Sequence, residues 1–354
     1  MVSNRIRFQE QILARRALYF INDTVYFRCQ ESTFSEHIID PWSNLSTIYE
    51  NNAQMSRLSQ SLRLQELPWD WDVLLSHYTR RNHTNEQDAL SATAGIGRRV
   101  SMRMNCTFFQ GIPGSMVDLF VTFFGSGPIL RRRKKFPSYS WAGWKGQIQQ
   151  NMPNGALDKW FSACSWIEWH LREPDGTVNR IWGYADFLSA VAKTERKEAI
   201  LRRKTVFNHE PIGLRTRPTK VKLKPPLPSY PILQFWTFSA YFKIDQINVF
   251  SATAAVIGHS GKKCGTIQME GFEDDKFFEA GGIYEFIFLS QPNGLLLSKT
   301  HFDGFSLVRG FSSYQVLVVE RGSQISERRG FGYVNIEGTD CFPPGFRWKE
   351  FFLG

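Results

Sequence analysis

The chain has 354 residues, which is enough for about two domains of ordinary size. Hydrophobic residues make up 42% of it and aromatic residues 15%, a composition that excludes a disordered chain. The formal net charge of +10 is compatible with an anionic partner, but charge alone decides neither the fold nor the function.

The cysteines and the apolar runs indicate the compartment. The five cysteines are too widely spaced for a zinc-site motif or a regular disulfide framework: Cys29, Cys106, Cys164, Cys264 and Cys341. The first ten residues lack the apolar core of a signal peptide, and no run approaches the roughly 18 apolar residues of a membrane span. We therefore expect reduced thiols, no transmembrane segment and an intracellular, cytoplasmic location.

Helical signals come first along the chain. Residues 4–18 show apolar side chains at helical period, and two short strands are expected at 17–21 and 25–29 around the turn at Asn22 and Asp23.

Three more helices are expected before residue 135, at 68–78, 84–97 and 116–124. Thr84 and Gln87 have the spacing of a capping box, which predicts the start of the second of these helices. Gly95 and Gly97 predict its end, because glycine commonly stops a helix.

From about residue 155 the pattern changes to strands. A hairpin is expected from 160–169 and 178–182, around a turn at 174–176. Further strands are expected at 233–244, 249–256, 264–269, 283–289, 314–320 and 330–336. Their spacing indicates an antiparallel β layer. The predicted fold class is therefore α+β, with a helical N-terminal half and a largely antiparallel β C-terminal part.

Residues 196–228 carry most of the net charge, with ten Lys or Arg residues against two Glu residues. Five prolines in the same stretch break regular structure, so we expect a linker or a disordered insertion. Binding of nucleic acid or of an acidic membrane is less favoured, because the basic residues lack the interleaved aromatic side chains of a single-strand platform.

Four blocks of residues stand out as motifs when they are taken in chain order. They are Phe8, Gln9 and Glu10; Tyr78, Arg81, Thr84, Asp88 and Gly95; Gly111 and Pro113; and Pro137, Ser138, Ser140, Trp141, Gly143 and Trp144. Together they resemble the fungal heterokaryon-incompatibility (HET domain) protein family, and residues 235–239 and 348–354 are similar to its C-terminal region. The chain departs from the family pattern at Ile6, His83 and Tyr139, where the family commonly has Trp, Leu and Trp.

The resemblance implies an N-terminally truncated member, because the two segments that open the defining domain of this family are missing. The expected division is 1–35 as the C-terminal remnant of that domain, 36–150 as a mainly helical region, 151–195 as a β-hairpin region, 196–230 as a basic, proline-rich linker or insertion, and 231–354 as an antiparallel β region. The family's role implies non-self recognition and programmed cell death. We expect a non-enzymatic scaffold or regulatory region that binds a protein partner. The alternative is a nucleotide-cleaving or other hydrolase that lacks the start of its catalytic domain, and a lower alternative is nucleic-acid binding through the basic segment.

Two local motifs have competing interpretations. Residues 137–144 alternate small side chains with aromatic rings, which fits either an exposed aromatic platform or a buried seam between the helical and β parts; the seam is favoured, because large rings are mostly buried. The basic run at 131–135 fits a localisation signal or a phosphate-binding patch, but is more often a solvated loop.

No catalytic, cofactor-binding or metal-ligating residue is expected. Ser76 and His77 lie near Asp72 and Asp88 in sequence, but no nucleophile-elbow motif accompanies them. The seven histidines are isolated, which argues against a metal site: His37, His77, His83, His170, His209, His259 and His301. Tyr78, Arg81 and Asp88 are expected to form a buried polar set, and the motif residues as a whole are interpreted as structural.

Overall fold

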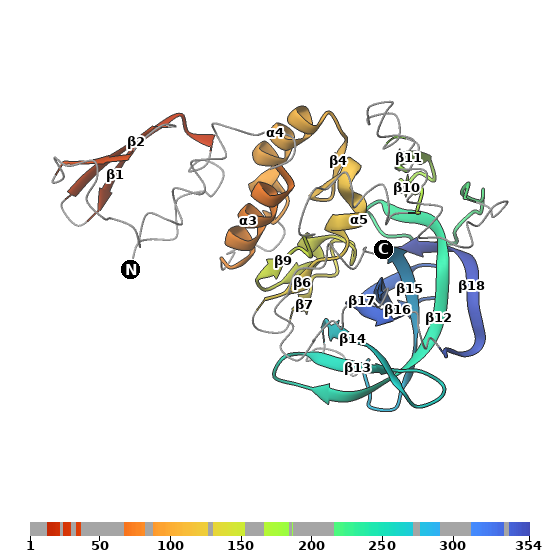
Figure 1. The fold of residues 1–354 in the computed structure, drawn as a ribbon. Coiled ribbons are helices and arrows are strands. Elements are labelled where there is room, and N and C mark those ends of the chain that lie inside the picture. The colour runs from red at the N-terminus through yellow and green to blue at the C-terminus, as the bar shows by residue number, and fades with distance from the viewer. Residues whose placement is uncertain are drawn as a thin grey trace, which may run out of the picture.

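The computed structural model describes residues 13–21, 24–29, 33–36, 67–81, 88–126, 130–152, 166–183, 186, 216–271, 277–290, 313–335 and 340–354. Strands account for 47% of these described residues and helices for 17% (Figure 1). The fold is therefore mostly β. The predicted α+β class is wrong, because the N-terminal half is not helical.

A small antiparallel sheet comes first in the described chain. It contains β1 (Arg16–Ile21), β2 (Thr24–Cys29) and β3 (Thr33–Ser35), in that order. The two strands expected at 17–21 and 25–29 are confirmed. The helix expected at 4–18 lies mostly outside the described residues, and its last part is wrong because Arg16 already belongs to β1.

Two longer helices follow, α3 (Leu67–Thr79) and α4 (Ala94–Met104). The helix expected at 68–78 is confirmed by α3. Thr84 and Gln87 lie outside the described residues, whereas α4 runs through both glycines that were expected to end a helix. Gly97 has a packing role instead, since a Cβ atom there would lie 2.5 Å from Cε1 of Phe108.

The region from 105 to 150 consists of very short elements. The helix expected at 116–124 is reduced to the four residues of α5 (Val117–Phe120). The other elements of this region are η3 (Gly114–Met116), η4 (Trp141–Gly143), and the paired strands β4 (Phe108–Phe109) with β5 (Ile112–Pro113), β6 (Phe124–Gly125) with β9 (Ile148–Gln149), and β7 (Arg131–Arg132) with β8 (Trp144–Lys145). A further short helix, η2 (Ser91–Thr93), directly precedes α4. Two-residue strands have no measurable period, so the sequence pattern could not predict them.

A nine-stranded sheet forms most of the rest of the described chain. Its strands are β10 (Trp169–Arg172), β11 (Val178–Trp182), β12 (Ile232–Asn248), β13 (Thr253–Ile257), β14 (Lys263–Met269), β15 (Ile283–Ser290), β16 (Ser313–Arg321), β17 (Ser326–Asn335) and β18 (Phe342–Leu353). The order runs β11-β10-β12-β13-β14-β17-β16-β15, and β15 also pairs with β12. The strands from β12 to β17 therefore close on themselves, and β18 lies along β12 (Figure 1). The six strands expected between 233 and 336 are confirmed. A hairpin also forms around the expected turn at 174–176, and β11 is its second strand as expected. The first strand was placed too early, because β10 begins at Trp169, where the predicted strand ends, and residues 166–168 belong to no strand.

Residues 137–144 lie in the core, at the seam between the short elements and the closed sheet. All eight are buried, and the rings of Tyr139, Trp141 and Trp144 have no exposed surface. The Tyr139 hydroxyl donates to Pro231 O at 2.7 Å, and the Ser138 hydroxyl accepts from Arg328 N at 2.8 Å. The rings of residues 137–144 are therefore buried between the short elements and the closed sheet, and none of them forms an exposed aromatic platform.

Strand β17 is buried on both faces where it meets this seam. Arg328 reaches from β17 to Glu270, with Nε donating to Oε2 at 2.8 Å, and its guanidinium lies 3.6 Å from the ring centroid of Phe123. The same guanidinium donates to the carbonyl oxygens of Val121 and Phe123. The ion pair therefore joins β17 to the end of β14, and the two bonds to carbonyl oxygens connect the short elements to the closed sheet. No helix in the described part of the chain is both long and apolar enough to cross a membrane.

Candidate ligand-binding groove

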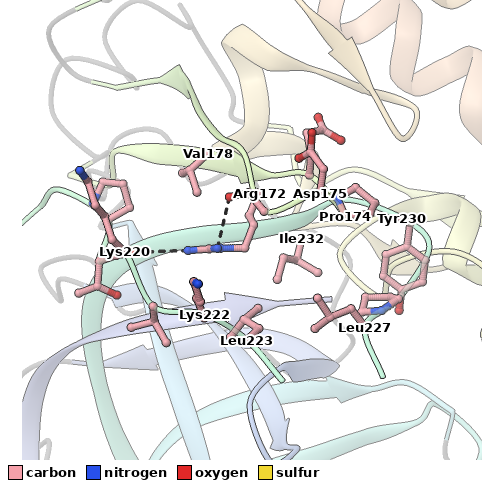
Figure 2. Close-up of a pocket in the computed structure, with 16 residues that line it drawn as sticks. Arg172, Pro174, Asp175, Val178, Lys220, Lys222, Leu223, Leu227, Tyr230 and Ile232 are labelled. Carbon is pink, nitrogen blue, oxygen red and sulfur yellow. Dashed lines mark hydrogen bonds between the residues drawn. The ribbon is translucent and has the colours of Figure 1, made fainter. Parts of the chain in front are cut away.

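A groove of about 660 Å³ lies between the turn of the β10–β11 hairpin and the extended chain at 218–230 (Figure 2). Arg172 and Ile232 lie at its floor. Residues 173–176 and 178 form one wall, and residues 218–223, 227, 228 and 230 form the other. The two walls are some 40 residues apart in sequence, so the groove exists only because β10 pairs with β12.

The basic wall is fixed in place by hydrogen bonds to the sheet. Thr219 N donates to Glu350 Oε1 at 2.7 Å, and the Thr219 hydroxyl donates to the other oxygen of the same carboxylate. Further along, Lys224 N donates to Gln324 Oε1 at 2.6 Å, and Gln324 Nε2 donates back to Lys224 O at 3.0 Å. Residues 216–230 contain neither helix nor strand, as expected from their prolines, but this part of the predicted linker is held against β12 and β18.

Arg172 places a positive charge at the floor of the groove. It is 7% exposed, and its donors meet neutral acceptors: Nε donates to Gln234 Oε1 at 3.0 Å, and Nη2 donates to Thr219 O at 3.2 Å. The Nη1 contact to Gly176 O is long, at 3.5 Å. Burial lowers the pKa of Arg172, and nearby Glu350 partly offsets this effect. A guanidinium remains protonated in proteins, so the floor is cationic.

The two rims of the groove carry opposite charge. Lys220 and Lys222 are exposed on one rim, whereas Glu173 and Asp175 lie on the other. Thr177 N donates to Asp175 Oδ1 at 2.8 Å, which lowers the pKa of this carboxyl and keeps it ionised. Apolar side chains of Val178, Leu223 and Leu227 lie between the charged groups (Figure 2). Such an arrangement can hold a ligand that carries both apolar and charged groups.

The serine and the aspartate that the sequence places near His77 on α3 both contact residues 147–150. Ser76 Oγ accepts from Gln147 Nε2 at 3.3 Å, and Asp72 Oδ1 accepts from Gln150 N at 2.8 Å. Both side chains therefore hold the chain around β9. His77 is the next residue after Ser76 on the helix and points about 100° away from it, and the pKa of His77 is lowered by burial and by Arg80 and Arg81. These groups do not form a nucleophile–base pair.

Asp72 makes the stability dependent on pH. Burial raises its pKa from 3.8 to about 6, against the opposing effect of the Gln150 hydrogen bond. Between these two values the folded protein binds more protons than the unfolded chain, so stability falls as pH rises from about 4 to 6. We expect Asp72→Asn to remove this dependence. The free energy of unfolding of the variant, relative to that of the parent, should be about 2–3 kcal/mol higher at pH 7 than at pH 4. Urea unfolding of both proteins at the two pH values measures this difference; parallel pH profiles would contradict it.

The expected buried polar set of Tyr78, Arg81 and Asp88 is only partly present. Tyr78 is buried, and its hydroxyl donates to Ala89 O at 2.9 Å; burial raises its pKa to about 12. Arg81 is half-buried, but Asp88 is exposed, so the prediction is wrong for the aspartate. The carboxylate stays in water because its hydration would be lost on burial.

The basic run at 131–135 divides between the seam and the solvent. Arg132 Nη1 donates to Phe136 O at 2.7 Å, and Arg133 Nη1 donates to Trp144 O at 2.6 Å. Both guanidinium groups therefore bind the seam, while Arg131, Lys134 and Lys135 are exposed. The solvated-loop interpretation holds for these three residues and is wrong for the two half-buried arginines.

The other motif residues also have local packing roles where they are described. Gly111 has φ +79°, and a Cβ atom there would lie 2.3 Å from Trp141 Nε1. Pro113 and Gly143 are buried, and Gly95 lies inside α4. Phe8, Gln9, Glu10 and Thr84 lie outside the described residues. Within the described ranges no group of three His, Cys, Asp or Glu side chains could hold a metal ion, and the cysteines placed there are free thiols.

The small N-terminal sheet exposes apolar side chains on one face. Register places Leu18, Phe27 and Phe34 in one row across the three strands, with Phe20 beside them. Leu18 is 59% exposed, Phe20 77% and Phe34 57%. Clustered exposed apolar side chains of this kind commonly mark contact surfaces.

The sequence analysis singled out the basic stretch at 196–228 and the turn at 174–176, but it did not predict that they form a groove with Arg172. One signal was present, because lysine alternates with Val221 and Leu223 over 220–224, and this period of two indicates extended chain. No signal could connect Arg172 and Glu350 with Thr219, which lie 47 and 131 residues from it. No family model, curated protein or solved structure matches this chain.

Proposed function

We propose that this chain is a non-enzymatic binding module of the heterokaryon-incompatibility type, which acts in non-self recognition and cell-death signalling by contacting a partner protein. The observation that carries the proposal is the groove, which combines a cationic floor, oppositely charged rims and apolar side chains on walls held by hydrogen bonds. Such a surface is suited to recognising a polypeptide. The resemblance of the four motif blocks to the family supplies the biological role.

Two further observations support binding over catalysis. The exposed face of the N-terminal sheet, with Phe20 and Phe34, offers a second surface for protein contact. The hydroxyl of Ser76 and the carboxylate of Asp72 are both engaged by residues 147–150, so neither is placed to activate a nucleophile. The resemblance to a region outside the family's defining domain favours a scaffold or regulatory role in the same way.

We expect the purified chain to hydrolyse neither NAD nor a p-nitrophenyl ester above the rate of a heat-inactivated sample. The reason is that Ser76, His77 and Asp72 are not joined into a nucleophile–base pair. Product formation over hours, measured by absorbance and by chromatography, tests this expectation. Ser76→Ala and His77→Ala serve as matched variants: turnover by the parent that either variant abolishes would overturn the non-enzymatic proposal in favour of the hydrolase alternative.

A further inference from the structure

We propose that the groove binds an extended, acidic segment of the partner protein, with acidic side chains at alternate positions facing Lys220 and Lys222. This inference rests on the proposed function, because it names the chemistry of the partner that the same groove would take.

The basic side of the groove has more positive charge than its own carboxylates neutralise. Lys220 and Lys222 are exposed and make no ion pair with a described residue. Glu350, whose charge acts on Arg172, already accepts from Thr219 and from Gln234 Nε2 at 2.6 Å. The contact from Arg172 Nη1 to Gly176 O is long, so this donor can form a hydrogen bond with the carboxylate of an entering ligand. Three cationic residues, Arg172, Lys220 and Lys222, therefore line the groove and favour an acidic ligand.

The spacing of the lysines matches that of an extended peptide. Lys220 and Lys222 lie two residues apart in a segment that is neither helix nor strand, and both are exposed and line the same wall of the groove. Alternate residues of an extended chain lie about 7 Å apart. Side chains at alternate positions of an extended ligand repeat at the same distance. A segment with acidic residues two apart therefore meets both lysines at once. Thr219 is hydrogen-bonded to Glu350, and Lys224 is hydrogen-bonded to Gln324. These bonds on either side of the lysine pair fix its backbone before a ligand binds, which lowers the entropic cost of binding.

The opposite rim argues for a peptide over a nucleic acid. A single strand carries a phosphate on every nucleotide, and its charge would repeat along Glu173 and Asp175 as well. A peptide can place neutral or basic groups against these carboxylates and acidic groups only against the lysines. The apolar side chains of Leu223, Leu227 and Val178 can receive the apolar residues that alternate with the acids.

The test uses three fluorescein-labelled probes: an acetylated heptapeptide of alternating Glu and Leu, its Lys and Leu counterpart, and a ten-nucleotide oligothymidylate. We expect fluorescence anisotropy with the full chain at low salt to show at least tenfold tighter binding of the acidic peptide than of the other two. Lys220→Glu/Lys222→Glu should weaken binding of the acidic peptide at least tenfold, and the variant should bind the basic peptide more tightly than the acidic one. Both lysines are exposed, so the variant should melt at the parent temperature.

The matched control is Lys134→Glu/Lys135→Glu, which reverses two adjacent exposed lysines away from the groove. It should leave acidic-peptide binding within twofold of the parent. Equal loss in the control and the groove variant would reveal only net-charge attraction and would overturn the inference, as would equal binding of both peptides. If the oligothymidylate bound more tightly than the acidic peptide and the groove variant lost this binding, the ligand of the groove would be a nucleic acid and not a peptide. None of these outcomes involves turnover, so they are distinct from a failure of the non-enzymatic proposal.

Discussion

We expect Arg328→Met to lower the free energy of unfolding by about 3–5 kcal/mol, because it leaves a buried charge without its partner. The side chains of Arg328 and Glu270 are 0% and 1% exposed. Burial raises the pKa of Glu270, and Arg328 lowers it again by its charge and its hydrogen bonds. Without the guanidinium, the carboxylate must either stay charged in a dry site or take up a proton. The carbonyl oxygens of Val121 and Phe123 lose their donors at the same time.

The size of this loss should depend on pH and on the second partner. In Arg328→Met the pKa of Glu270 rises, because the neighbouring positive charge is gone. The loss of unfolding free energy relative to the parent should therefore be smaller at pH 5 than at pH 8. Arg328→Met/Glu270→Gln removes the unpaired charge and should recover part of the loss, although the two carbonyl oxygens still lack a donor. Urea unfolding of the parent and both variants measures these values. A single-variant loss below about 1 kcal/mol would show that the pair is not buried as described.

Four strands of the closed sheet, β12, β13, β15 and β16, could be predicted because each is rich in apolar residues. The less apolar β14 and β17 were indicated by the spacing of the turns. Strand β12 and its neighbours bury alternating or continuous apolar side chains, a signal that does not depend on distant contacts. The same reasoning overestimated the helices. Apolar residues at 116–124 have helical spacing, but only Val117–Phe120 is α-helical, and Phe124 pairs with Gln149 in β6–β9. Tertiary packing therefore overrode local propensity.

Neither the groove nor the buried ion pair could be predicted, for a common physical reason. Each depends on side chains brought together by sheet pairing: Arg328 and Glu270 are 58 residues apart, and Thr219 and Glu350 are 131 apart. A proline-rich basic stretch is typical of a linker. Hydrogen bonds to the side chains of Glu350, Gln234, Gln324 and Arg172 hold this one as a fixed wall. Local sequence contains no trace of such partners. The buried seam was easier to predict, because alternating small and aromatic residues indicate close ring packing in themselves.

Trp141 gives the sharpest test of that seam. Its ring has no exposed surface, its Nε1 donates to Gly111 O at 2.9 Å, and the ring of Tyr78 meets it edge-on with centroids 5.6 Å apart. Trp141→Ala would leave a cavity beneath the seam and orphan the Gly111 carbonyl. We expect a loss of about 3–5 kcal/mol, a large share of a typical domain stability of about 5–15 kcal/mol.

Two variants separate this structural role from a binding role. Trp141→Phe keeps an aromatic ring and loses the hydrogen bond to Gly111, so it should cost less than the alanine variant. Phe250→Ala removes an aromatic side chain that is fully exposed and should stay within about 0.5 kcal/mol of the parent. Thermal melts and soluble yield of the four proteins give the comparison. If Trp141→Ala melted at the parent temperature, like Phe250→Ala, the ring would not be in the core, and an exposed aromatic platform would again be the better interpretation of residues 137–144.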